Sequence, residues 1–225
     1  MSKLRTPSML QDNLDKELAW RLKEVADLTL AIKSSPSSHQ RTLIRAGVPL
    51  LYAHWEGFIK NSSLSYIQFV SDQGLRLDQL SSCFIVFGAK KHLSALTQSK
   101  RSKINIEAVN FFMSQLNSSA TLSMSSAVNT ESNLSSSVFD NIAISIGINP
   151  DRYSSRYNLI DESLLKKRNE IAHGEYLDLR AEEYRSLVDE VIQLMRWYKT
   201  DIENAVALGS YKNTTIAQPS AAAGQ

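Results

Sequence analysis

The sequence contains a single cysteine, Cys83, so an internal disulfide and a cysteine-rich zinc site are both excluded. The apolar neighbours at 84–87 indicate a small buried side chain rather than a nucleophile. The four histidines, at positions 39, 54, 92 and 173, are scattered along the chain. No group of residues has the spacing of a zinc or di-metal carboxylate site, so we expect neither a metal nor another cofactor.

Long apolar runs are also lacking. No stretch approaches the roughly 20 residues that a membrane-spanning helix needs, and residues 1–20 lack the apolar segment of a signal peptide. We therefore expect a cytoplasmic protein without a membrane partner. The net charge of +2 is too small to indicate a nucleic-acid binder by itself, although clustered charges could still form a basic surface.

Strand–helix alternation, a glycine-rich phosphate loop and internal repeats are absent, and helical periodicity fills most of the chain. The spacing of apolar residues predicts an all-α bundle. A loop is expected at 149–158. The predicted helices cover residues 10–33, 43–70, 78–97 (starting at an aspartate cap), 105–116, 132–148, 161–174 and 181–208.

One domain over residues 1–212 is the organisation that we predict. Ten serines and no glycine or proline lie between residues 114 and 137. We interpret 114–131 as a connecting segment, with a short extended piece at 120–128 as one option; the composition leaves open whether the segment is ordered. The tail at 213–225 is expected to be disordered.

The stretch LLKKRNEIAHGEY at 164–176 combines the spacing of a packed helix with three polar residues. We expect this helix to begin at Asp161 as N-cap and to stop at Gly174. Asn169 and His173 are one turn apart, whereas Arg168 and His173 are roughly 140° apart on an ideal helix. Two routes could bring Arg168 and His173 together: a loosened helix end, or a second copy across a two-fold axis.

These residue types suit RNA cleavage without a metal. His173 can transfer a proton near neutral pH, and Arg168 offers a planar cation suited to phosphate. Asn169 could orient the imidazole. The alternative is that Arg168 and Asn169 are solvated or paired with Glu170, and that His173 only caps the helix. The spacing alone does not decide between these readings.

A carboxylate in an apolar setting is costly unless it is paired, and Glu56 in LLYAHWEGFIK is such a residue. It could support Arg168 or His173, or it could form a structural salt bridge between two helices. Either reading predicts that Glu56→Ala is destabilising or inactivating.

Two basic sets could contact RNA. The first, close to the motif, is the better candidate for substrate phosphates and comprises Arg152, Arg156, Lys166 and Lys167. The second lies at 90–103, where five lysines and arginines occur without an acid. It could steer RNA towards a cleft, or it could be a solvated helix end and loop.

The stretch RNEIAHG resembles the R-x4-H signature of the HEPN superfamily, with its frequent polar residue directly after the arginine. The motif lies on the penultimate predicted helix, as that resemblance requires. Residues 50–67 (LLYAHWEGFIKNSSLSYI), together with SNL at 132–134 and IGI at 146–148, are similar to a bacterial HEPN-like nuclease family. The similarity covers roughly residues 45–205.

The resemblance implies a HEPN-like helical bundle that dimerises through its motif helices and a metal-independent endoribonuclease, often a toxin or effector in bacterial defence or stress. Arg168 would hold the scissile phosphate, His173 would transfer protons and Asn169 would orient them. An antitoxin or a companion sensor protein would be the controlling partner. The alternatives are a non-catalytic module that binds a partner protein or nucleotide, and a nuclease that needs a trigger.

Overall fold

The computed structural model describes residues 3–122, 128, 130 and 133–214. Within these ranges the regular structure is entirely helical, and β-pairing is limited to two isolated bridges. The all-α prediction is confirmed. No described helix is long and apolar enough to cross a bilayer. The predicted extended piece at 120–128 lies mostly outside the described residues, as do residues 215–225 of the tail.

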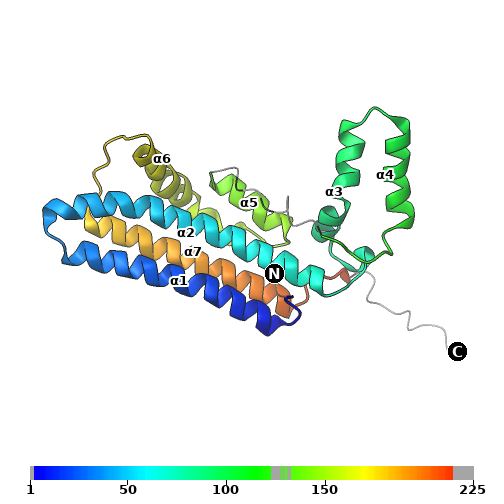
Figure 1. Ribbon diagram of the computed structural model, residues 1–225, viewed down its shortest axis with the longest axis horizontal. Helices are drawn as coiled ribbons and strands as arrows, with labels where there is room; N and C mark the ends of the chain where they lie inside the picture. The colour runs from blue at the N-terminus through cyan, green and yellow to red at the C-terminus, as the bar shows by residue number, and fades with distance from the viewer. Residues whose placement is uncertain (1–2, 123–127, 129, 131–132, 215–225) are drawn as a thin grey trace.

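Three long helices, α1 (Pro7–Ser34), α2 (Ser37–Asp72) and α7 (Ala181–Ala207), lie along one another and form the body of the protein (Figure 1). The Thr6 side chain caps α1 by accepting a hydrogen bond from the Met9 amide. The Glu183 carboxylate accepts a hydrogen bond from the Arg180 amide at the start of α7. Pro49 lies inside α2.

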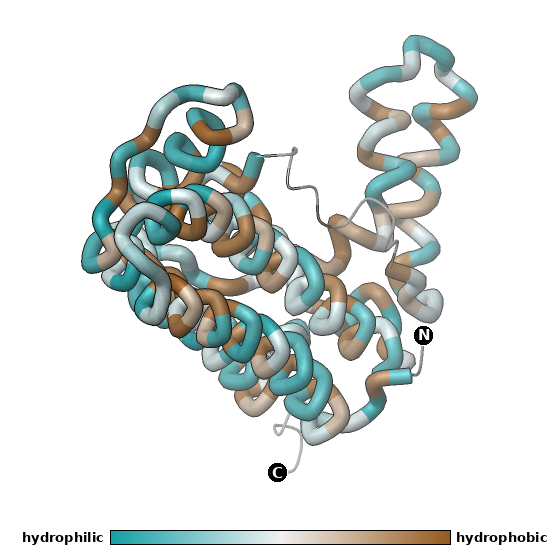
Figure 2. The backbone as a smooth tube through the Cα atoms, turned by 60° about the vertical axis from the view of Figure 1, so that its left-hand side comes forward, coloured by the Kyte–Doolittle hydropathy of each residue, from teal (hydrophilic) through white to brown (hydrophobic). Residues whose placement is uncertain are grey.

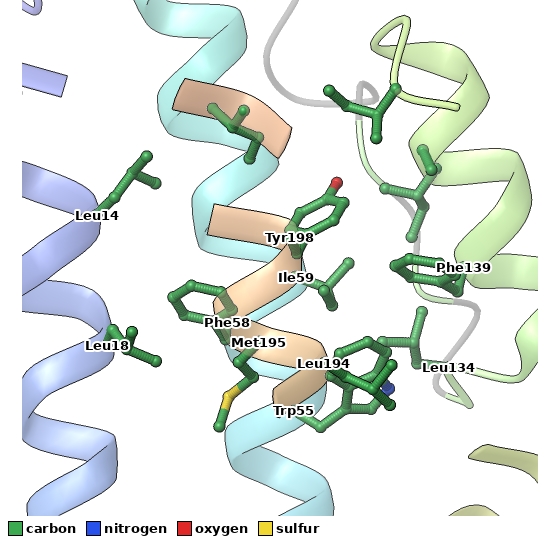
Figure 3. Close-up of a cluster of buried hydrophobic side chains, with 14 of the residues drawn as sticks. Leu14, Leu18, Trp55, Phe58, Ile59, Leu134, Phe139, Leu194, Met195 and Tyr198 are labelled. Atoms are coloured by element: carbon green, nitrogen blue, oxygen red, sulfur yellow. The ribbon is translucent and has the colours of Figure 1, made fainter. Parts of the chain in front are cut away.

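Side chains from all three long helices, and from α5 (Ser136–Ser145), meet in the core shown in Figure 3. Trp55, Phe58 and Tyr198 are almost completely buried. The cluster is mainly aliphatic and aromatic, and it extends from Leu4 to Tyr211. One dominant core is what the single-domain proposal for 1–212 requires.

The helices α3 (Ser82–Gln98) and α4 (Ser102–Ser114) form a hairpin that projects from the end of this body (Figures 1 and 2). A smaller apolar cluster of Leu77, Ala89 and Phe111 holds its base. The predicted aspartate cap of α3 is wrong: Asp78 lies in the short 3-10 helix η1 (Leu77–Gln79), and Ser81 occupies the N-cap position. The cations of 90–103 extend from the middle of α3 across the turn into α4.

The segment between α5 and α7 is helical from residue 151 to residue 172. The predicted loop at 149–158 is wrong, because residues Asp151–Arg156 form the 3-10 helix η2. A π-helix, η3 (Leu159–Lys166), follows and leads directly into the short helix α6 (Lys167–Ala172). Buried Tyr153 anchors η2, since its ring packs on Phe139 and its hydroxyl donates to Asp201.

Candidate functional site

The α6 helix lies against α2 (Figure 1), and its Arg168 side chain contacts Tyr52 of that helix. The Arg168 guanidinium carbon lies 4.3 Å from the centroid of the Tyr52 ring, a cation–π distance. Its Nη1 donates to Asn169 Oδ1 at 2.7 Å and to Asn133 Oδ1 at 3.1 Å. An aromatic face and two amide oxygens from three different segments therefore fix the direction of this cation.

Tyr52 and Asn133 are site residues that the sequence did not single out for a role. Tyr52 is 2% exposed, and its hydroxyl accepts a hydrogen bond from the Leu134 amide at 2.6 Å. This bond holds the segment before α5 against α2 and places Asn133 beside Arg168. Burial raises the pKa of Tyr52, and Glu56 raises it further, while the Leu134 amide and Arg168 act in the opposite direction. The phenol is therefore neutral at physiological pH.

The position of Glu56 follows from this arrangement. It lies one turn beyond Tyr52 on α2, and its charge contributes to the raised pKa of the Tyr52 phenol. The two readings of Glu56, support of the site or a salt bridge between helices, and the consequence of Glu56→Ala remain predictions.

Asp161 caps a different helix from the one expected. The sequence predicted it as N-cap of the motif helix, but the chain is already helical before it, in η3. Its carboxylate instead accepts hydrogen bonds from the amide of Ser136 at 2.7 Å and from the hydroxyl of the same residue at 2.5 Å. Ser136 is the first residue of α5, where a negative charge is favoured. Asp161 thus ties the motif helix to the segment that carries Asn133.

His173 occupies the C-cap of α6 and is exposed. The helix ends as predicted at Gly174, whose φ of +80° allows the reversal of the chain. Backbone bonds from Gly174 to Ile171 and from Glu175 to Glu170 complete a Schellman turn. Among the residues that the structure describes, we find no hydrogen bond, ion pair or ring contact of the His173 imidazole.

The helix α6 therefore does not aim Arg168 and His173 at the same point. Arg168 is directed at Tyr52, whereas His173 is five residues further on, at the exposed end, where an ideal helix would turn it roughly 140° away. No loosening occurs before the cap. The described residues therefore do not support convergence of the two side chains within one copy.

Three of the four cations proposed for substrate phosphates are engaged with acids. Arg152 pairs with Asp201 at 2.6 Å and lies 4.8 Å from the Trp197 ring centroid. The other pairs are Arg156 with Glu190 at 3.2 Å and Lys166 with Glu162 at 2.7 Å. Lys167 is partly buried and lowers the pKa of Glu183, behind the larger effect of Arg180. These contacts give the first three a structural role, and phosphate binding by any of the four remains a proposal.

No cluster of three or more His, Cys, Asp or Glu side chains within the described ranges could hold a metal ion. Burial raises the pKa of the Cys83 thiol, which is hydrogen-bonded to Ser81, and this favours the unreactive protonated form. The functional groups at hand are thus a guanidinium, an imidazole, amides and a phenol.

A model of the RiboL-PSP-HEPN family matches residues 16–204, a range that begins within α1 and ends near the end of α7. The chain belongs to this family. HEPN domains are usually nuclease modules, and the matched range contains Arg168, Asn169 and His173. No curated protein and no solved structure matches the chain. Family membership confirms the HEPN-like bundle that the sequence predicted.

Proposed function

We propose that this HEPN protein is a metal-independent endoribonuclease. The observation that carries the proposal is the fixation of Arg168 on the Tyr52 ring by Asn169 and Asn133. Such a preorganised cation suits a phosphate that gains charge in the transition state. The imidazole of His173, exposed at the end of the same helix, is the candidate for proton transfer.

In this mechanism the nucleophile belongs to the substrate. The ribose 2′-oxygen attacks phosphorus while its proton passes to a His173 imidazole. The bond between phosphorus and the 5′-oxygen breaks, and that oxygen takes up a proton from the solvent, to which the imidazolium returns its own. The products are a 2′,3′-cyclic phosphate and a 5′-hydroxyl. Arg168 balances the charge on the phosphorane, and Asn169 holds the guanidinium in place.

A homodimer through the motif helices would place the His173 imidazole of one copy opposite Arg168 of the other copy. This arrangement resolves the divergence of Arg168 and His173 on a single helix. The active unit is then the dimer, and Arg168 and His173 of both copies line one cleft, in which each guanidinium faces the imidazole of the other copy.

The test is cleavage of end-labelled RNA by purified protein in EDTA. We expect wild-type activity with cyclic-phosphate ends and a loss of about a hundredfold or more in Arg168→Ala and in His173→Ala. Matched controls remove the same groups elsewhere: Arg185→Ala on α7 and His92→Ala on the projecting hairpin should remain active. Intact RNA at high protein concentration would favour a non-catalytic module that binds a partner or nucleotide.

Subunit complementation tests the composite cleft. Mixing Arg168→Ala with His173→Ala should restore up to about a quarter of the wild-type rate, because half of randomly formed dimers are mixed and each holds one complete pair. If both groups acted from the same copy, no mixed dimer would contain a complete site, and the mixture would stay inactive.

The biological role that we propose is that of a toxin or effector held in check by an antitoxin or a companion sensor protein. Induced expression in a bacterial host should arrest growth with the wild type, and growth should continue with Arg168→Ala at equal protein level. Arrest by both proteins would separate any toxicity from RNA cleavage.

A further inference from the structure

A hollow of about 640 Å³ lies beside the motif helix, between the first turns of α2 and the segment that follows α6. Arg41 and Arg45 of α2 lie on one side, and Ile171, Tyr176 and Leu177 on the other. The lining therefore includes the residue two positions before His173 in the sequence and the residues three and four positions after it.

The chemistry of the lining is specific. Tyr176 is 78% exposed, which is unusual for so large an aromatic side chain. Arg45 Nη1 donates to the Glu175 carbonyl at 2.5 Å, which holds the segment carrying Tyr176 against α2. Arg41 is exposed. Among the described residues that line the hollow, none is acidic, and most of the others are apolar.

The hollow lies on the same face of α2 as the Tyr52 ring that contacts Arg168. Arg45, Pro49 and Tyr52 follow one another at spacings of four and three residues, so they share one face of α2. Arg45 and Pro49 line the hollow, and Tyr52 carries Arg168. The distance along the helix axis from Arg45 to Tyr52 is about 10 Å, which a strand of RNA can span.

We propose that this hollow binds one nucleotide of single-stranded RNA next to the scissile phosphate. Its base stacks on Tyr176 and the apolar lining, and its phosphate contacts Arg41 and Arg45. The proposal rests on the proposed nuclease function and adds a subsite to it. A duplex cannot bind in this way, because its bases are already stacked and paired. The hollow is less suited to binding the same surface of a second copy of this chain, because four guanidinium groups would then lie close together.

A short fluorescein-labelled oligouridine with methylated 2′-oxygens is the probe, because it cannot be cleaved. We expect Tyr176→Ala to weaken its binding by about tenfold or more, and Tyr176→Phe to keep it within about twofold, since a stacking face remains. Arg41→Ala should weaken binding and reduce the slope of log Kd against log salt by about 0.7. Arg185→Ala is the matched control and should leave both quantities unchanged.

Binding within about twofold of wild type in both Tyr176→Ala and Arg41→Ala would overturn the subsite, as would equal loss with a duplex probe. If Tyr176→Ala converted a dimer to a monomer in light scattering, the hollow would be a contact between two copies, and the proposed nucleotide subsite would also be overturned. The two proposals fail separately. Absence of cleavage by the wild type refutes the nuclease but not the binding result, whereas normal cleavage without an effect of Tyr176→Ala on probe binding refutes the subsite alone.

Discussion

Replacing Tyr52 by phenylalanine removes one oxygen atom from beneath the motif arginine and leaves the aromatic ring. The lost hydroxyl is the acceptor for the Leu134 amide at 2.6 Å, and both residues are almost completely buried. A buried donor left without an acceptor costs about 1–3 kcal/mol. We therefore expect Tyr52→Phe to lower the free energy of unfolding by that amount.

Tyr52→Leu removes the ring face as well, and should cost about 0.5–2 kcal/mol more because Arg168 loses its cation–π contact. The assay is urea unfolding followed by circular dichroism, with the m-value required to stay constant. The matched control is Tyr198→Phe, which deletes an equally buried hydroxyl that shares a 2.6 Å hydrogen bond with Ser63 away from the site.

RNA cleavage separates the variants further. Tyr198→Phe should lose stability but keep its activity at temperatures where it is folded, whereas Tyr52→Leu should lose activity because Arg168 is no longer held in one direction. Tyr52→Phe should fall between them. A Tyr52→Phe protein within about 0.5 kcal/mol of wild type would show that the Leu134 amide finds another acceptor, and the reasoning on this contact would be refuted.

Three further predictions concern other contacts. Gly47→Ala should destabilise the protein by about 1–3 kcal/mol in urea unfolding, because a Cβ there would lie 2.6 Å from the Tyr184 hydroxyl oxygen. Adding Tyr184→Leu should recover part of that loss. If the double variant instead lost the sum of the two single losses, the proposed clash would be contradicted. Burial lowers the pKa of His54 below 6.5, so the unfolded state binds the proton more tightly, and the free energy of unfolding should fall as the pH drops below that value. His54→Gln should flatten this dependence of stability on pH, and a pH profile equal to that of the wild type would contradict the prediction. Asp161→Ala removes both acceptors of Ser136 and should lower the melting temperature and slow RNA cleavage together; full activity in a folded Asp161→Ala protein would show that this carboxylate does not position the site.

The helices could be predicted because their apolar residues repeat at helical spacing over many turns. In α7, for example, buried Leu187, Val191, Leu194 and Tyr198 lie on one face, and the predicted span 181–208 agrees with Ala181–Ala207. The end of the motif helix was predicted well, because Gly174, with a positive φ, stops it, whereas the helix predicted over 132–148 is shorter at both ends, Ser136–Ser145.

Aspartate was the less reliable signal. An Asp before an apolar run predicts an N-cap of its own helix, yet the carboxylate of Asp161 caps α5, which is 25 residues away in sequence. The 3-10 helix at 151–156 was missed because no apolar repeat fits its tighter turn, and its one buried anchor is Tyr153. Contacts with residues far away in the sequence determine such elements, and the spacing of residues within the element does not reveal those contacts.

For the site, the sequence identified the motif residues but not their surroundings. Asn133 lies 35 residues from Arg168 in sequence and reaches it only because the Tyr52 hydroxyl holds the neighbouring amide. Tyr52 itself belongs to the LLYAHWEG stretch, which pointed to the right helix face without indicating a role. The pairing of Arg152 and Arg156 with acids was hidden for the same reason.

The π-helical turns of η3 make the aim of the motif arginine depend on chain length. One residue fewer between 159 and 166, with the turns otherwise unchanged, would rotate everything downstream by roughly 80–100°. Arg168 would then lose its contact with the Tyr52 ring although every motif residue was still present. Substitutions in this stretch should thus be tolerated far better than single-residue deletions, and a homologue with a shortened η3 and an intact motif is the place to look for a silent enzyme.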